Sequence, residues 1–483
     1  MSLQQLRFMS HFERKDLFTD PVPFSPVCPG YSEGLDLVLR DQNNTAKAAV
    51  ARRQNARSKF QSPTLPQRPD AFVQELCVSQ ESLSIDFFTS SFPDPTADEQ
   101  SQRGFVDLIP FLYHRVALDS PLALCVAAIS HLIFNKWVRN AQNPETFQAK
   151  KAYGKALAST RLALQDPISM VTDDTLMTVC LLGFYEACFE SFRARISSPC
   201  HYEGAGALIS QRRGQSMTKT TGTLLMGIRS NIAYRAALTG SVVDFHSPVW
   251  QDLDEVPLNV ASLLDVMIAE VANFQASMRQ AIASASKLGE DDQIRLEDPQ
   301  ISLQASEMHS RLISWIETVP ADWTPISVPH FQIPESVTQA GLYGTNCDIY
   351  KDIIVCSTWN DWRVARLKVL VVLARCCTGH KRAEMVEAIQ ELADAICASI
   401  PFCLGSRTLP APMHAQNIQY PSEPGKLIPK PHYKTAAAYG GWYLFVPMKQ
   451  VIAVGNYLRD GQSMWVALQL RRLAEIYNVV PMS

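Results

Sequence analysis

The side chains that could act as acids, bases or nucleophiles do not form a recognised catalytic arrangement in this sequence. His114, His131, His201 and Glu203 could supply acid–base groups if the fold brought them into one cavity. A single histidine in an apolar helical pattern, such as His131, is more often a hydrogen-bonded core residue. These residue types therefore favour a scaffold or binding protein over an enzyme, without excluding catalysis.

Motifs for metals, phosphates and cofactors are also missing from the sequence. It contains no H-E-x-x-H, no C-x-x-C and no G-x-x-x-x-G-K-[ST]. The G-x-G at Gly204 to Gly206 lies in a helical pattern without a preceding strand, which indicates close helix packing. Cys376 and Cys377 are adjacent and are interpreted as structural residues. We therefore expect no cofactor and no metal site.

The elements that must position these residues are predicted to be helices. Apolar residues recur at helical spacing over residues 146–164 and 173–187, and Asp173 or Asp174 is expected to cap the second of these helices. Further helices are expected over residues 201–210, 223–238, 258–288, 301–316, 348–376, 382–397, 435–458 (kinked at Pro447) and 463–477. Alternation typical of strands is almost absent. The fold class is therefore all-α, a large irregular helical array over residues 101–483.

Residues 1–100 differ from this helical region and are interpreted as a largely irregular, proline-rich arm. Four prolines fall between positions 21 and 29, which disfavours a regular helix. A basic stretch follows and has no acidic residue between positions 46 and 60. A solvated segment is the simpler interpretation, and a nuclear-targeting or phosphate-contacting arm is the alternative. The candidate nucleic-acid contacts are Lys47, Arg52, Arg53, Arg57 and Lys59.

Composition limits the class of protein further. The sequence has 44 Lys and Arg against 47 Asp and Glu, so it has no basic excess for bulk nucleic-acid binding. The longest apolar stretch, residues 121–134, is shorter than the ~20 residues that span a membrane, and the first 20 residues lack a secretory signal. The 12 cysteines are scattered, which favours a reducing, intracellular compartment. We expect no membrane partner.

Several segments taken together resemble the fungal binuclear zinc-cluster transcription factors, in particular their helical regulatory domain. Cys28-Pro29-Gly30-Tyr31 resembles the C-x-G-Y step that closes the zinc cluster in that family. The other segments that carry the resemblance, in the order the family has them, are residues 35–42, 153–164, 173–186, 201–209, 213–214, 396–402 and 441–448. The resemblance covers roughly residues 25–480 and implies a transcriptional regulator that acts in the nucleus, with the cytoplasm as the alternative location.

The zinc cluster itself departs from the family pattern. The family holds two zinc ions with six cysteines, and Cys28 matches the last of them, but residues 1–27 contain no cysteine. A single thiolate cannot hold a structural zinc site, which needs about four ligands. The resemblance therefore implies a regulator that works through dimerisation or a protein partner, without direct sequence-specific DNA binding, or else a truncated gene model. The basic stretch would be the former linker and could contact only phosphates.

Two other interpretations remain open. The helical domain could have been recruited as an enzyme, such as a cyclase or pericyclase, because a shaped apolar pocket can accelerate such reactions without acid–base groups. It could also be a non-catalytic sensor or adaptor that binds a small molecule. In either case the residues expected to line a pocket are His131, Trp137, Phe184, Tyr185, His201, Trp442 and Tyr443. A role in secondary metabolism follows from family analogy alone.

Overall fold

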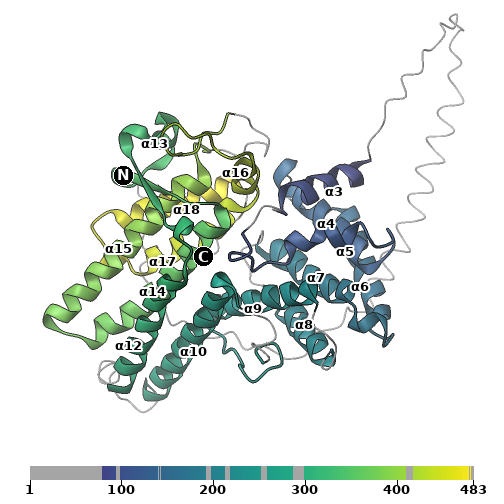
Figure 1. Cartoon of the computed structure of the whole chain (residues 1–483), viewed down its shortest axis with the longest axis horizontal. Helices are drawn as coiled ribbons and strands as arrows, with labels where there is room; N and C mark the ends of the chain where they lie inside the picture. The colour runs from purple at the N-terminus through teal and green to yellow at the C-terminus, as the bar shows by residue number, and fades with distance from the viewer. Residues whose placement is uncertain are drawn as a thin grey trace, which may run out of the picture. The chain divides into compact units, whose positions relative to one another are not determined.

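The computed structural model describes residues 79–479 apart from 94–97, 140, 142, 192–196, 213–217, 252–257, 287–298, 409–416 and 478, and it does not describe the side chains of residues 281–286. The chain divides into two units, Met1–Cys77 and Val78–Ser483. Cys28 and the basic residues Lys47, Arg52, Arg53, Arg57 and Lys59 lie outside the described residues. The described residues all belong to the second unit (Figure 1).

The second unit begins earlier than the boundary at residue 101 that the sequence suggests. Helix α3 (Gln80–Ser91) is capped by Ser79, whose hydroxyl accepts a hydrogen bond from the Ser82 amide at 3.1 Å. Phe87 and Phe88 on this helix are buried in the core. Two large aromatic side chains give α3 enough apolar surface to pack on the rest of the unit.

The first group of helices is arranged around α5 (Pro121–Ile133), which packs against α3, α6 and α7. The other helices here are α4 (Ile109–Tyr113), α6 (Phe147–Ala163), α7 (Asp173–Ser191), α8 (Cys200–Gln211) and α9 (Lys219–Thr239). With its π-helical continuation, η2 (Phe134–Val138), α5 forms an apolar stretch of 18 residues, longer than the sequence suggests. That stretch is long and apolar enough to cross a membrane, but 72% of it is buried inside the protein, which is also typical of a core helix.

The second group of helices is arranged around α14 (Ile353–Cys376), which packs against α10, α12, α15 and α17. The other helices of this group are α10 (Val260–Ser286), α12 (Pro299–Ser314), α13 (Glu335–Gly341), α15 (Gly379–Leu404), α16 (Lys430–Thr435), α17 (Phe445–Ala453) and α18 (Gln462–Ile476). Helix α9 packs on α10 and so joins the two groups (Figure 1).

The all-α prediction is confirmed for the described residues, which contain only two short strands. Strand β1 (Ile326–Pro329) pairs antiparallel with β2 (Asn346–Ile349), with Ile326 opposite Ile349. Each strand has four residues, so neither is long enough to show alternation in the sequence. The two strands and α13 between them lie where the sequence suggests a loop and the start of the 348–376 helix.

Two local predictions were wrong. Asp173 does not cap α7: the hydroxyl of Thr172 accepts the Thr175 amide at 3.2 Å, and Asp173 instead binds Arg212 at 2.7 Å. The predicted helix over residues 435–458 is interrupted at Gly441, between the π-helical turn η7 (Ala436–Gly440) and the 3-10 turn η8 (Trp442–Leu444), and not at Pro447. Pro447 lies in the first turn of α17, where a missing amide hydrogen costs nothing.

Candidate functional site

Close packing of α7 on α8 creates the group of side chains with the clearest chemical potential. Gly183 on α7 faces the ring of Tyr202 on α8, and a Cβ atom at that position would lie 3.1 Å from the ring. Gly206 on α8 is also closely covered, since a Cβ atom there would lie 2.7 Å from the side chain of Val249, but Val249 lies in the turn between α9 and α10, so the close contact is with a turn and not with the helix that the G-x-G predicted. The absence of a side chain at Gly183 lets the end of α7 meet the start of α8.

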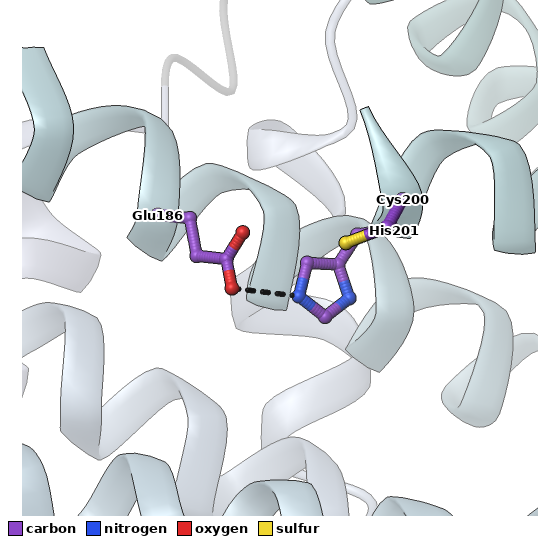
Figure 2. A group of neighbouring side chains, drawn as sticks. All are labelled: Glu186, Cys200 and His201. Atoms are coloured by element: carbon purple, nitrogen blue, oxygen red, sulfur yellow. Dashed lines mark hydrogen bonds and ion pairs between the residues drawn. The ribbon is translucent and has the colours of Figure 1, made fainter. Parts of the chain in front are cut away.

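Glu186, Cys200 and His201 meet where these two helices come together (Figure 2). The Oε1 atom of Glu186 lies 3.1 Å from Nε2 of His201. The Sγ atom of Cys200 completes the group, and the three possible ligand atoms all lie within 4.8 Å of one another. Water reaches the group, because the side chains of His201 and Glu186 are 15% and 29% exposed and Cys200 is exposed.

A tyrosine pair supports the carboxylate of Glu186. The hydroxyl of Tyr153 on α6 donates a hydrogen bond to Glu186 at 2.7 Å, and its ring stacks on Tyr185 with centroids 4.2 Å apart. Burial by itself raises the pKa of Glu186. The hydrogen bond to His201, the charge of His201 and the hydrogen bond from Tyr153 all lower that pKa, and together they outweigh the effect of burial. Glu186 is therefore ionised at neutral pH and is ready to accept hydrogen bonds or a cation.

Cys200 differs from the other cysteines of the described residues. It is the only one of them that is exposed, whereas Cys180 and Cys188 on α7 are buried. Burial raises the pKa of both α7 thiols to about 12, so they stay protonated and unreactive. Within the described residues, a thiolate that can bind a metal or react with a solute is therefore most accessible at Cys200.

Three of the predicted pocket residues pack within an aromatic cluster. The ring of Trp137 stacks on Phe92 at 5.4 Å and meets the edge of Trp442 at 6.4 Å. Tyr443 meets Tyr439 edge to face at 5.4 Å, and Tyr439 also contacts Phe92 at 6.1 Å. These contacts join α3 and η2 to the region between α16 and α17, and they stabilise the packing of the two helix groups.

The remaining predicted pocket residues lie in two other places. His131 on α5 is buried and its Nδ1 lies 3.2 Å from the hydroxyl of Ser84, consistent with a hydrogen-bonded core histidine. His201 belongs to the group of Glu186, Cys200 and His201 at the junction of α7 and α8, called the α7–α8 group below. Tyr185 stacks on Tyr153 beside that group, and Phe184 is partly buried against the core. These contacts divide the seven residues among three locations, and their role as walls of one ligand pocket stays a prediction.

A surface groove at α3 and α4 is one place where the described residues leave room for a small molecule. Its volume is about 540 Å³, and it includes His114, one of the acid–base candidates. The lining is mainly apolar: Leu83, Phe87, Pro110, Phe134 and Val138, with Asp86, Thr89, Ser90 and His114 as the polar members. Volumes of this size are typical of small-molecule sites.

A buried charge cluster joins three segments that sequence patterns do not connect. Arg103 donates a hydrogen bond to Asp361 on α14, and its Nη1 lies 3.6 Å from Oδ1 of Asp265 on α10. Burial raises the pKa of Asp265 to about 6, against the opposing charge of Arg103. Lys368 lies with Asp361 along a small cavity of about 20 Å³, enough for one water molecule, and its pKa is lowered to about 8 by burial.

Comparison with known proteins gives a family match over most of the helical unit. Residues 93–413 match the family described as the fungal specific transcription factor domain. The chain is also similar to a protein named transcription factor dbaG of Emericella nidulans, with 24% identity over 366 residues, which cover 70% of this chain and 76% of that protein. No solved structure matches.

Proposed function

This chain belongs to the fungal specific transcription factor domain family and is a regulator of transcription, and we propose that it controls a secondary-metabolite gene set from the nucleus. The observation that carries the proposal is the extent of the family match, residues 93–413, which include the helices from α4 to α15. The nuclear location follows from the family's role, and the pathway class from analogy.

We propose that contact with DNA depends on a partner or on a second copy of the chain. Residues 1–76 contain one cysteine, Cys28, whereas the family's zinc cluster needs six. The basic residues between positions 47 and 59 can add contacts to phosphates, which strengthen binding without reading base sequence. A small molecule bound to the helical unit is a further part of this proposal, and the groove at α3 and α4 is where a search would begin.

Deleting the gene and measuring transcripts and metabolites in parallel tests the regulatory role. We expect the transcripts of one group of biosynthetic genes to fall together, along with their product. If transcripts stay constant while a single intermediate accumulates, the regulator proposal fails for that pathway. The purified protein would then be assayed as an enzyme on that intermediate.

Binding of the purified full chain to duplex DNA tests the role of the basic stretch. Replacing Lys47, Arg52, Arg53, Arg57 and Lys59 by glutamine should weaken binding equally for all sequences and reduce the dependence of affinity on salt. The matched control replaces five basic residues on α6 and α9: Lys150, Lys151, Lys155, Arg161 and Lys219. Tight binding to one DNA sequence by the purified chain as a monomer, with its oligomeric state measured in the same sample, would contradict the need for a partner or a second copy.

A further inference from the structure

We propose that Glu186, Cys200 and His201 form a binding site for one zinc ion, at the junction of α7 and α8 (Figure 2). The ligand atoms would be a carboxylate oxygen of Glu186, the sulfur of Cys200 and Nε2 of His201. This site is separate from the family's zinc cluster, because it lies within the helical unit. Zinc binding here does not depend on which genes the protein regulates.

The combination of ligand atoms favours zinc. One nitrogen, one sulfur and one oxygen form a mixed set of the borderline-soft kind that zinc accepts, whereas calcium and magnesium prefer oxygen alone. Zinc bonds of about 2.0–2.3 Å place tetrahedral ligand atoms roughly 3.3–3.8 Å apart. The observed limit of 4.8 Å is about 1 Å larger, and rotation of the exposed Cys200 side chain can close that difference.

The charges of the group also match a divalent cation. With Cys200 as the thiolate and Glu186 as the carboxylate, two negative charges balance the two positive charges of the ion. The Cys200 thiol proton is released to water on binding. Nε2 of His201 must present its lone pair, so the imidazole binds as the neutral ring with its proton on Nδ1. The ion thereby replaces the hydrogen bond between His201 and Glu186.

The surroundings hold these ligands in place while leaving a route for the ion. Tyr153 donates a hydrogen bond to Glu186 at 2.7 Å, the kind of supporting contact that orients a metal ligand. The neighbouring residue Tyr202 is buried against Gly183 and fixes the start of α8. Because Cys200 is exposed, an ion can reach the group directly from water. Three protein ligands leave a fourth position for water or another ligand.

Bound zinc would connect the end of α7 to the start of α8. Glu186 lies in the last turns of α7, and Cys200 and His201 form the first turn of α8. A bridge between the two helices stabilises the native state, because the unfolded chain lacks the preformed ligand geometry. We therefore expect zinc to raise the thermal stability of the protein as well as to bind it.

The test uses the purified full chain, stripped with a chelator and titrated with Co²⁺ as a spectroscopic probe and then with Zn²⁺ in competition. Cys28 and Cys77 are replaced by serine in every protein tested, so that thiols outside the described residues do not contribute. We expect one Co²⁺ per chain, with the charge-transfer absorption of a cobalt–thiolate bond, displaced by one equivalent of Zn²⁺.

Variants at the three ligands and at Tyr153 then assign the site. Cys200→Ser should abolish the thiolate absorption, and Cys200→Ser, His201→Gln and Glu186→Gln should each weaken zinc affinity by more than about 100-fold. Tyr153→Phe should weaken it by about 10–100-fold, as expected for a residue that orients a ligand. Circular dichroism of each chelator-treated variant checks that the fold is retained.

Two matched controls leave the site intact. His380→Gln removes the histidine of another histidine–glutamate pair, in which Nδ1 of His380 lies 2.9 Å from Glu384. Cys377→Ser removes a partly exposed thiol elsewhere. Both should bind zinc as the parent protein does. The proposal is overturned if the parent protein binds no Co²⁺ with thiolate absorption. It is also overturned if Cys200→Ser binds zinc with the affinity of the parent protein, or if the two control variants lose as much zinc affinity as the ligand variants.

Discussion

The Arg103 cluster and the α7–α8 group are both built from charged side chains, but they differ in how much water reaches them. Arg103, Asp265 and Asp361 have side chains that are 14%, 3% and 11% exposed. Glu186 and His201 are 29% and 15% exposed, beside an exposed cysteine. Burial raises the pKa of both aspartates, whereas hydrogen bonds lower the pKa of Glu186.

This difference indicates two separate roles. In the buried cluster, the charges pair with one another and hold α10, α14 and the segment before α4 together, so changing one of them changes stability. In the α7–α8 group, the carboxylate is ionised and the thiol is accessible, so the side chains are available to a ligand. Substitutions in the buried cluster should therefore lower the stability of the protein, whereas substitutions in the α7–α8 group should mainly affect ligand binding. The largest change in the free energy of unfolding should come from the buried cluster.

Removing Arg103 should have the largest effect on stability. Arg103→Met removes the cation that pairs with both buried carboxylates, and we expect the free energy of unfolding to fall by about 3–5 kcal/mol. Urea unfolding of the full chain measures it. Arg311→Met is the control, because Arg311 pairs with Glu270 at 2.7 Å with its side chain 52% exposed, and its loss should cost less than about 1 kcal/mol. Equal losses of unfolding free energy in Arg103→Met and Arg311→Met would contradict the conclusion that the buried cluster stabilises the fold more than an exposed ion pair does.

The pH dependence of stability should reveal Asp265. Its pKa is raised to about 6 in the folded state, so the native protein holds this proton more tightly than the unfolded chain does between about pH 4 and pH 6. The free energy of unfolding therefore loses up to about 3 kcal/mol from this group as pH rises through that window.

Asp265→Asn should remove that loss, because asparagine does not ionise. Unfolding at several pH values measures the difference between variant and parent, which should grow in favour of the variant from about pH 4 to about pH 6. Asp119→Asn, which removes a carboxyl group at an exposed position, serves as the control. Parallel profiles for Asp265→Asn and the parent would show that Asp265 titrates normally.

Zinc should stabilise the protein through the α7–α8 group alone. At a free zinc concentration about 100 times the dissociation constant, binding adds about 2.7 kcal/mol to the free energy of unfolding. Because the two charged groups share no residue, the same increment should appear in Arg103→Met and vanish in Cys200→Ser. Thermal unfolding with and without zinc measures the increment, and its loss in Arg103→Met would show that the two groups are coupled.

The smallest expected effect comes from the tyrosine pair. Tyr153→Phe removes a 2.7 Å hydrogen bond to Glu186 and should cost about 1 kcal/mol in the absence of zinc. Tyr185→Phe keeps the stacked ring and removes a longer hydrogen bond of 3.3 Å to Glu145, so it should cost less. Urea unfolding of both variants measures the two losses in the free energy of unfolding. A larger loss for Tyr185→Phe would contradict the assignment of Tyr153 as the tyrosine that contributes more to stability here.

Most helices could be predicted from the sequence, because their signals are local. The predicted helix over residues 146–164 is α6, and its start is capped by Thr146, whose hydroxyl accepts the Ala149 amide. The interruption at Gly441, after η7, was not predictable in the same way. Gly441 lies against Tyr477, whose ring would be 2.2 Å from a Cβ atom at that position, and that contact joins residues far apart in the chain.

The candidate site was predictable only in part, because it too depends on contacts between residues that lie far apart in the chain. His201 was identified as a candidate, but its meeting with Glu186 and Cys200 depends on how α7 packs on α8. Gly183 was the available signal, because a glycine within a buried apolar helix often marks a close helix contact. The Arg103 cluster had no sequence signal, since its members come from three separate segments with no shared motif.

Chromatin immunoprecipitation of the tagged full chain in its host, combined with transcript measurements in the deletion strain, tests the regulatory function most directly. We predict that the protein is enriched at promoters of the genes whose transcripts fall on deletion, and that enrichment depends on a partner protein or a second copy of the chain. Absence of the protein from those promoters, with unchanged transcripts and one blocked metabolic step, would contradict a role in transcription.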